Sequence, residues 1–563
     1  MMDERTDARG RPTAGREPAT GGVALFGVAL SGVAVRRDAT RTARALGLLV
    51  AAWLVLPGTA AASDSPLADA AMEGDAGRVR LLLERGASLR AAQGDGMTAL
   101  HWAAFRDDLR VADLLLAADA DVMARTRVGG LTPLWFAAEN GSAAMLDRLL
   151  TTEADVNVTT STGATLLMAA ALSGSVEAID LLVARGAFLD TRDTANGQTA
   201  LMFAAWENRA DAIRALAGHG AHVGLMSLIV SMIEPRLDRE GNPIPPRRRR
   251  APGGNSVMGG MTALLFAARD GHMGAVRALF ESGADVDQVS GGDGTSPIVI
   301  AIANGHYTVA QYLLDRGADP NLVNIDGLGP VYATVNMRFA PVSWAPNPRT
   351  DQEAVDSLDL LRALLARGAD PDARIARKLW FSPTSHDRSW VDPSGSTPFW
   401  RASQSSDVEA MRILVDAGAD PNLATARGTT PLMVAAGIGW AGNFTQNAPD
   451  SFLDAVRYCL ELGADVRAVD ARGFTALHGA AGRGDNEMVR YLVERGARVD
   501  AINRDGNSPA DMAFGPSRFF LPKPDTVDLL VALGSPFQDN CRSDQCVDGK
   551  FFGGADGAAP FRE

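Results

Sequence analysis

A period of 33 to 34 residues constrains this chain more than any other feature of its sequence. The clearest copy runs from Arg472 to Asp500 and reads RGFTALHGAAGRGDNEMVRYLVERGARVD. Thr475 stands where a hydroxyl can accept the free N–H groups at the start of a helix, and Ala480 and Ala481 keep one side of that helix thin. Apolar residues recur at helical spacing from 486 to 494, which predicts a second helix. Gly496 lies where this second helix should end, because a left-handed residue costs glycine little.

The same punctuation recurs along most of the chain. An Ala-Ala pair follows five residues after most of the N-cap positions, and a glycine stands 21 residues after seven of them. In two units Asp119 and Glu153 stand at this glycine position, so both are expected to hold left-handed backbone angles. A period near 33 residues is typical of solenoids built from stacked helix pairs. The expected N-cap residues are Ser65, Thr98, Thr132, Thr165, Thr199, Thr262, Ser296, Thr397, Thr430, Thr475 and Ser508.

The wording of the repeat resembles that of the ankyrin repeat family, with Thr-Ala-Leu-His at 98–101 and 475–478 and Thr-Pro-Leu at 132–134 and 430–432. The resemblance implies an all-α fold, an ankyrin-repeat solenoid of about twelve helix-turn-helix units with β-hairpin loops. One unit alone cannot bury its apolar face, so the units are expected to stack into one elongated domain over 63–536. The family also implies that His101 and His478 act as hydrogen-bonding struts between neighbouring units.

Residues 1–62 are expected to be an N-terminal extension and signal peptide. Arginines precede a run of twelve apolar residues, Ala45 to Leu56, and small residues follow at Ala60 and Ala62. These are the three parts of a secretory signal, with cleavage expected after Ala62. The alternative is an uncleaved membrane anchor, but a span needs about 20 apolar residues. We therefore expect a periplasmic or secreted protein with no membrane contact after cleavage.

Composition favours an exported bacterial protein. Lysine occurs at only three positions, whereas arginine and alanine are abundant, as in proteins of GC-rich genomes. The net charge of −13 argues against nucleic-acid binding, which needs a basic face. In the polar C-terminal tail, 537–563, Cys541 and Cys546 could form a disulfide in an oxidising compartment. Cys459 takes a core position on a second helix and is expected to pack there.

The chain carries no recognisable enzyme motif. HExxH, GxSxG, a phosphate-binding loop and CxxCH are all missing from the sequence. We therefore expect no catalytic residues, no cofactor and no metal site.

Material added to the 33-residue period marks four inserted loops. The alternative to a pure scaffold is that one of them carries a site for a small molecule or carbohydrate, or a hydrolytic site. Trp380, His386 and Trp390, with Asp387 as a carboxylate, are the candidates for it. The arginines at 247–250 follow prolines and are expected to be a solvated loop. The inserted loops are predicted at about 223–258, 340–354, 374–392 and 439–450.

The ankyrin resemblance implies a non-enzymatic, monomeric scaffold that binds a protein partner of unknown identity on a concave face. The contact positions in the family are the residue before each N-cap and the pair after Ala-Ala. Exposed aromatic residues and arginine often anchor such interfaces. In this chain the positions correspond to Met97, Leu131, Met261 and Phe474 at the hairpins and to Phe105, Arg106, Glu139, Asn140, Trp206, Glu207, Arg269 and Asp270 at the helix ends.

Overall fold

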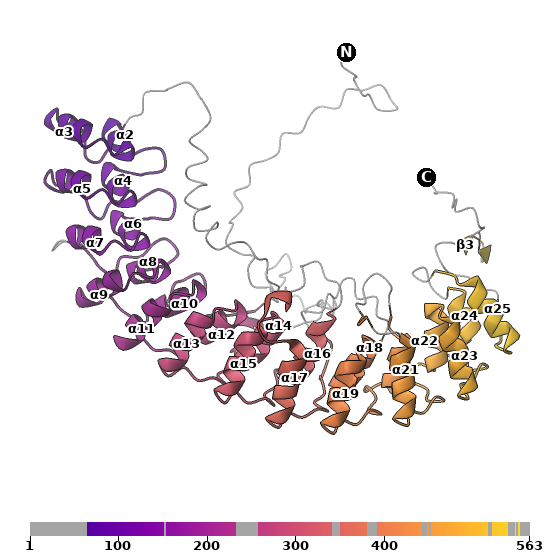
Figure 1. Ribbon diagram of the computed structural model, residues 1–563. Coiled ribbons are helices and arrows are strands. Elements are labelled where there is room, and N and C mark those ends of the chain that lie inside the picture. The colour runs from indigo at the N-terminus through magenta and orange to yellow at the C-terminus, as the bar shows by residue number, and fades with distance from the viewer. Residues whose placement is uncertain are drawn as a thin grey trace, which may run out of the picture. The chain divides into compact units, whose positions relative to one another are not determined.

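The structure is a computed structural model that describes residues 65–150, 154–231, 257–340, 350–379, 391–440, 447–449, 452–515, 521–538, 546–547 and 550–551. Within this part of the chain, twelve helix pairs follow one another in sequence order (Figure 1). The prediction of an all-α solenoid of about twelve units is confirmed.

In each pair the first helix packs against the first helices of the neighbouring pairs. The first helices are α2 (Pro66–Glu73), α4 (Ala99–Phe105), α6 (Pro133–Glu139), α8 (Leu166–Ser173), α10 (Ala200–Trp206), α12 (Ala263–Arg269), α14 (Pro297–Ala303), α16 (Pro330–Arg338), α18 (Pro398–Gln404), α20 (Pro431–Ala436), α22 (Ala476–Arg483) and α24 (Pro509–Ala513).

The second helices form a row of their own along the stack. They are α3 (Ala76–Glu84), α5 (Leu109–Leu116), α7 (Ala143–Leu149), α9 (Val176–Ala184), α11 (Ala210–Gly218), α13 (Met273–Glu281), α15 (Tyr307–Asp315), α17 (Ser357–Ala366), α19 (Val408–Asp416), α21 (Phe452–Glu461), α23 (Asn486–Glu494) and α25 (Pro524–Ala532). A short 3-10 helix, η1 (Thr350–Gln352), precedes α17.

Many of the first helices begin after a residue whose side chain caps the helix. Thr132 Oγ1 accepts the N–H of Trp135 at 3.3 Å, and Thr262 does the same for Leu265 at 3.2 Å. Such a bond satisfies one of the N–H groups that have no partner inside the helix. In the unit of α16 the cap is Gly329 and Pro330 follows at the first helical position, where a missing N–H does no harm.

The two repeat histidines connect neighbouring units, as predicted. His101 Nδ1 lies 3.1 Å from the backbone N of Thr98, and its Nε2 lies 3.1 Å from the carbonyl of Leu131 in the next unit. His478 makes the same pair of contacts, the second of them at 3.2 Å to Asn507 O. Burial disfavours the charged ring and lowers the pKa of both histidines, in His478 to about 4.

The loops between units are joined by backbone hydrogen bonds. A residue near the tip of one loop donates its N–H to a carbonyl of the preceding loop. Near the N-terminal end of the stack Arg127 N–H donates to Asp95 O at 2.8 Å, and near the C-terminal end Arg504 N–H donates to Arg472 O at 2.8 Å. Most of these loops are turns, and only a few reach strand geometry. Within the described residues, β1 (Ile229–Ser231) pairs antiparallel with β2 (Val257–Gly259), and β3 (Cys546–Val547) pairs with β4 (Lys550–Phe551).

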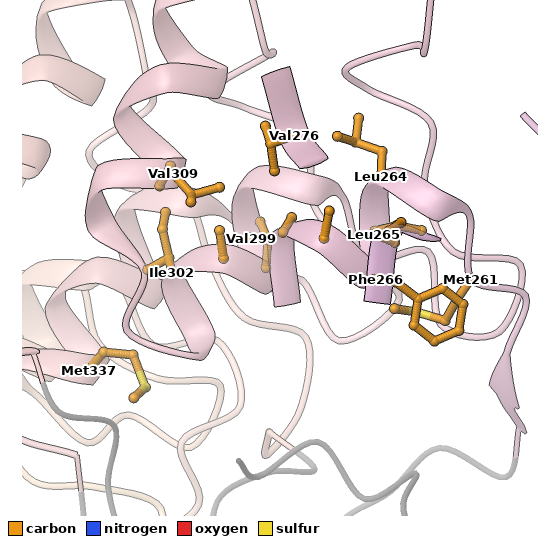
Figure 2. Close-up of a cluster of buried hydrophobic side chains, with 14 of the residues drawn as sticks. Met261, Leu264, Leu265, Phe266, Val276, Val299, Ile302, Val309 and Met337 are labelled. Carbon is orange, nitrogen blue, oxygen red and sulfur yellow. The ribbon is translucent and has the colours of Figure 1, made fainter. Parts of the chain in front are cut away.

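The hydrophobic core runs continuously from unit to unit. Figure 2 shows Leu264 and Leu265 of α12, Val299 and Ile302 of α14 and Met337 of α16 as members of one buried cluster. The Ala-Ala pairs are fully buried throughout, because their small side chains let adjacent helices approach closely. A single unit would leave most of this surface in water, so the stability of each unit depends on its neighbours.

Several non-glycine residues adopt left-handed backbone angles. Asp119, at the end of α5, has φ +64°, as predicted from its place in the repeat, whereas Glu153 lies outside the described residues. Asp107, Asn208 and Ser406 have φ between +55° and +56°, in the turn between the two helices of their units. In most other units that turn carries a glycine.

Some predictions concern residues beyond the described ranges. The signal peptide at 1–62, the arginines at 247–250, and Cys541 all lie outside them, and of Cys546 only the backbone in β3 is described. Cys459 is buried on α21, as predicted, and burial raises the pKa of its thiol to about 12. Among the described helices, none has the length and apolar character needed to cross a membrane.

Candidate binding surface

The C-terminal ends of the first helices present the pair of residues that follows Ala-Ala to the outside of the stack. We call the predicted members of this set the first-helix face: Phe105, Arg106, Glu139, Asn140, Trp206, Glu207, Arg269 and Asp270. Phe105 and Trp206 are 38% and 43% exposed, which is unusual for side chains of this size in a well-packed helix pair.

Phe105 is exposed but held in place. Its ring meets Trp102 edge to face at 5.6 Å between centroids and Phe136 of the next unit at 5.8 Å. Trp102 is itself fixed, because its indole N–H donates to Gln93 Oε1 at 2.9 Å. Aromatic pairs of this geometry contribute about 0.5–1.5 kcal/mol beyond their buried area. Phe105 therefore offers an apolar surface whose orientation is set before any partner binds.

Trp206 forms a second aromatic position three units further along. Its ring lies 6.4 Å from that of Phe203, one turn earlier on α10, at an interplanar angle of 35°. Phe203 is half-buried, so the tryptophan has a neighbouring ring that is held by the core. Glu207 follows as the half-buried C-cap residue of α10.

Arg269 and Asp270 form a closed ion pair on the end of α12. Arg269 Nε and Nη2 donate to the two carboxylate oxygens of Asp270, both at 2.8 Å, and the guanidinium lies 5.1 Å above the ring of Phe266. Both side chains are half-buried. The positive and the negative charge are therefore held next to each other, and a partner would contact both of them.

Arg106, Glu139 and Asn140 are exposed, but their roles differ. The amide of Asn140 donates to Ala104 O at 3.0 Å and to Phe105 O at 2.9 Å, so it caps α4 of the preceding unit. Although Glu139 is exposed, the surrounding protein removes part of its hydration and raises its pKa, and a hydrogen bond from Trp135 offsets part of this. The guanidinium of Arg106 lies beside Gly74 of the preceding unit.

The predicted contact residues at the hairpins are not on the surface, contrary to the prediction. Met97, Met261 and Phe474 are buried, and Leu131 is half-buried. The main chain at this position closes the loop, as in the bond from Asp470 N to Phe474 O at 3.0 Å, while the side chain turns inward between neighbouring units. Figure 2 places Met261 in the same cluster as Phe266. These three side chains are packed into the core between units, and the prediction that they form part of an exposed contact surface is corrected here.

Sequence reasoning also missed features. Val128, Ile325, Val469 and Ile502 are exposed apolar residues in the loops between units. Their only sequence signal is an apolar residue close to the Gly of each loop. The first-helix face was chosen as the pair of residues after each Ala-Ala. In the unit of α22 this pair includes Arg483, which is buried.

The alternative site was predicted in the inserted loop at about 374–392. Trp380, His386, Asp387 and Trp390 all lie outside the described residues. In the parts of the chain that the structure does describe, no group of three or more His, Cys, Asp or Glu side chains could hold a metal ion.

Comparison with known families identifies the class of the protein. The family profile for ankyrin repeats in three copies matches residues 42–126, 129–227, 249–324 and 446–538, which is more than half of the chain. The profile for a single ankyrin repeat matches residues 394–426. The chain belongs to the ankyrin repeat family, whose repeats typically form non-enzymatic scaffolds that bind other proteins.

Individual proteins resemble limited parts of the chain. Ankyrin repeat and SAM domain-containing protein 6 of Danio rerio is 28% identical over 169 residues, which cover 28% of this chain and 21% of that protein. Palmitoyltransferase ZDHHC13 of Mus musculus is 28% identical over 31% of this chain and 28% of its own length. Protein phosphatase 1 regulatory subunit 27 of Homo sapiens is 40% identical over 68 residues, 12% of this chain and 44% of that protein. The chain thus spans less than a third of the first two relatives.

Proposed function

We propose that this protein is an exported scaffold of the cell envelope or exterior that binds a protein partner on its first-helix face. The observation that carries the proposal is the pair of exposed but supported aromatic side chains, Phe105 and Trp206, at equivalent positions of different units. Rigid aromatic anchors give binding energy at little entropic cost, and they are enriched at the centres of protein interfaces.

The charges around these anchors favour a protein as the partner. Arg106, Glu139 and the Arg269–Asp270 pair place both signs of charge near the aromatic positions. Mixed charge suits a protein surface, whereas a nucleic acid requires a continuous basic face. The backbone bonds between loops hold the units in register, which supports a preformed surface.

The test is affinity capture from periplasm or culture medium with the mature chain, followed by titration of the purified partner. Phe105→Ala and Trp206→Ala are introduced together, and the matched control is Phe188→Ala. Phe188 is 67% exposed and lies after the end of α9, away from the first helices. Hot-spot residues cost more than about 1 kcal/mol each, so we expect the double variant to bind at least about tenfold more weakly.

The control should bind as the wild type does, and all three proteins should remain folded by circular dichroism. Equal affinity of the double variant and the wild type would refute the first-helix face as the binding surface. Equal losses in the double variant and in Phe188→Ala would indicate a nonspecific apolar contact.

Export needs a separate measurement. N-terminal sequencing of the exported protein should begin at Ser63, because cleavage is expected after Ala62. Recovery of the intact segment Ala45 to Leu56 from a membrane fraction would support an anchor in place of a cleaved signal.

A further inference from the structure

Arg483 is the last residue of α22 and stands at the position that forms the first-helix face in other units. Here the side chain is only 9% exposed. The guanidinium carbon lies 3.7 Å from the ring centroid of Phe452 and 5.3 Å from that of Trp440. Trp440 lies near the start of the insertion predicted at 439–450 and Phe452 follows its end, so these two rings cover a position that is exposed in several other units.

The guanidinium has fewer partners than its burial requires. Nη1 donates to Ala435 O at 3.3 Å. Nε and Nη2 are buried, and neither has an acceptor among the described residues. The carboxylate of Asp485 acts on Arg483 only through its charge and accepts the N–H of Met488 at 3.0 Å instead. Buried donors, above all charged ones, are rarely left unpaired in native proteins.

Nε and Nη2 together form one edge of the planar guanidinium, with two nearly parallel N–H bonds. This edge matches the two oxygens of a carboxylate. The described residues give examples of this arrangement: Arg269 binds Asp270, Arg338 binds Asp407 and Arg498 binds Asp500, each through Nε and Nη2 to the two carboxylate oxygens. At Arg483 the corresponding carboxylate is missing from the described part of the chain.

A third donor belongs to the same cluster. The indole N–H of Trp440 is buried and has no acceptor among the described residues. The cluster therefore holds three buried nitrogens able to donate and no carboxylate bound to them. The aromatic rings near the guanidinium stabilise its charge and exclude water, which strengthens hydrogen bonds to an anion.

We propose that the Nε/Nη2 edge of Arg483, beside Trp440 and Phe452, is a subsite that binds a carboxylate. The carboxylate can come from an acidic side chain of the bound protein partner or from a small free carboxylate. The first source rests on the proposed function, because it makes the subsite part of the partner-binding surface. The second source does not depend on any protein partner.

The test follows the Nε–H resonance of Arg483 by NMR in the full chain labelled with ¹⁵N-arginine. Arg483→Lys, which keeps the charge and loses the edge, assigns the resonance. One titration uses sodium acetate at ionic strength held constant with sodium chloride. The other compares the peptides acetyl-Gly-Gly-Glu-Gly-Gly-amide and acetyl-Gly-Gly-Gln-Gly-Gly-amide.

We expect the Arg483 Nε–H proton to move downfield and to saturate with acetate or with the glutamate peptide, but not with the glutamine peptide. Trp440→Phe, which removes one donor, should weaken the affinity by about three- to tenfold. The resonance of Arg498, whose edge Asp500 already occupies, should stay in place and serves as an internal control. A response to acetate alone assigns the site to small carboxylates, and a response to the glutamate peptide supports the partner's acidic side chain.

A resonance that no carboxylate moves would overturn the proposal, since it would mean that an acceptor of this chain already fills the edge. An equal response to the glutamate and glutamine peptides would also contradict it. None of these titrations contains the protein partner, so their failure is distinct from failure of the proposed function. A partner that still requires Phe105 and Trp206 would leave that function standing.

Discussion

Ser406 offers a direct test of how the repeat constrains the backbone. It lies between α18 and α19 with φ +55°, a left-handed angle that costs a residue with a Cβ about 1 kcal/mol or more. Its hydroxyl is also buried and has no hydrogen-bond partner among the described residues. Gly305 and Gly484 hold the equivalent position in other units with φ +80° and +82°. We therefore predict that Ser406→Gly stabilises the protein.

The size of the effect follows from three contributions. Relief of the left-handed angle contributes about 1 kcal/mol. Removal of a buried, unpaired hydroxyl contributes a further 1–3 kcal/mol or so. The greater freedom of glycine in the unfolded chain offsets about 0.4–1 kcal/mol of this. The net expectation is a gain of about 1–3 kcal/mol in the free energy of unfolding.

Two measurements test this prediction. Urea denaturation gives the unfolding midpoint, and native-state hydrogen exchange reports the local stability of α18 and α19. Because repeats in a solenoid can unfold in sections, the exchange rates of these helices are more informative than one global midpoint. The midpoint should rise, and the amides of both helices should exchange more slowly than in the wild type.

Asn208→Gly is the matched control. Asn208 has φ +56°, but its Oδ1 accepts the N–H of Ala275 at 2.9 Å and so caps α13, whose own N-cap residue His272 provides no such bond. Loss of a cap costs about 0.5–2 kcal/mol, and asparagine tolerates the left-handed region well, so this variant should be neutral or less stable. A destabilised Ser406→Gly, or equal effects of the two variants, would refute the reasoning.

Three further predictions concern charge and register. Asp119→Gly should raise the free energy of unfolding by a few tenths of a kcal/mol, since Asp119 is left-handed just after the end of α5, and the urea midpoint should rise with it. Destabilisation would mean that the angle is not strained. Asp372→Asn should stabilise at pH 7, because desolvation and the charges of Asp370 and Asp420 raise the pKa of Asp372 and disfavour its ionised form. Solvent screens this half-buried carboxylate, which limits the gain to about 0.5 kcal/mol, and the amide oxygen can still accept the Asp420 N–H. This gain should vanish below the usual carboxyl pKa of about 4, and a gain that persists there would exclude a charge effect. Burial lowers the pKa of His478 from 6.5 to about 4, so the unfolded chain binds a proton more readily than the folded protein between these pH values. The free energy of unfolding therefore falls by up to about 3 kcal/mol as the pH drops from 6.5 toward 4, and this loss is absent above pH 6.5. His478→Gln should therefore flatten the stability curve between pH 7 and 4, and an unchanged slope would show that other groups control it.

Much of the fold could be read from the sequence because its signals are local and repeated. A hydroxyl at the N-cap, a thin Ala-Ala side and a residue tolerant of left-handed angles each act within a few residues of the chain. Their recurrence at one period fixed the helix boundaries, the number of units and the left-handed angle of Asp119. The resemblance to the ankyrin family also implied that His101 and His478 connect neighbouring units, and each ring does contact a carbonyl of the next unit.

The tertiary structure decided which of these positions face solvent. Phe474 and Met261 occupy positions that the repeat marks as contacts, yet each turns inward, because the loops of adjacent units lie against each other. Asn140 is exposed, but its amide serves the preceding helix. Arg483 stands at the position where Arg106 and Asn140 are exposed in their units, but Trp440 and Phe452 lie against it. A period determines where a residue lies within its own unit, whereas its exposure and its free hydrogen-bonding groups depend on atoms that neighbouring units and inserted chain bring to it.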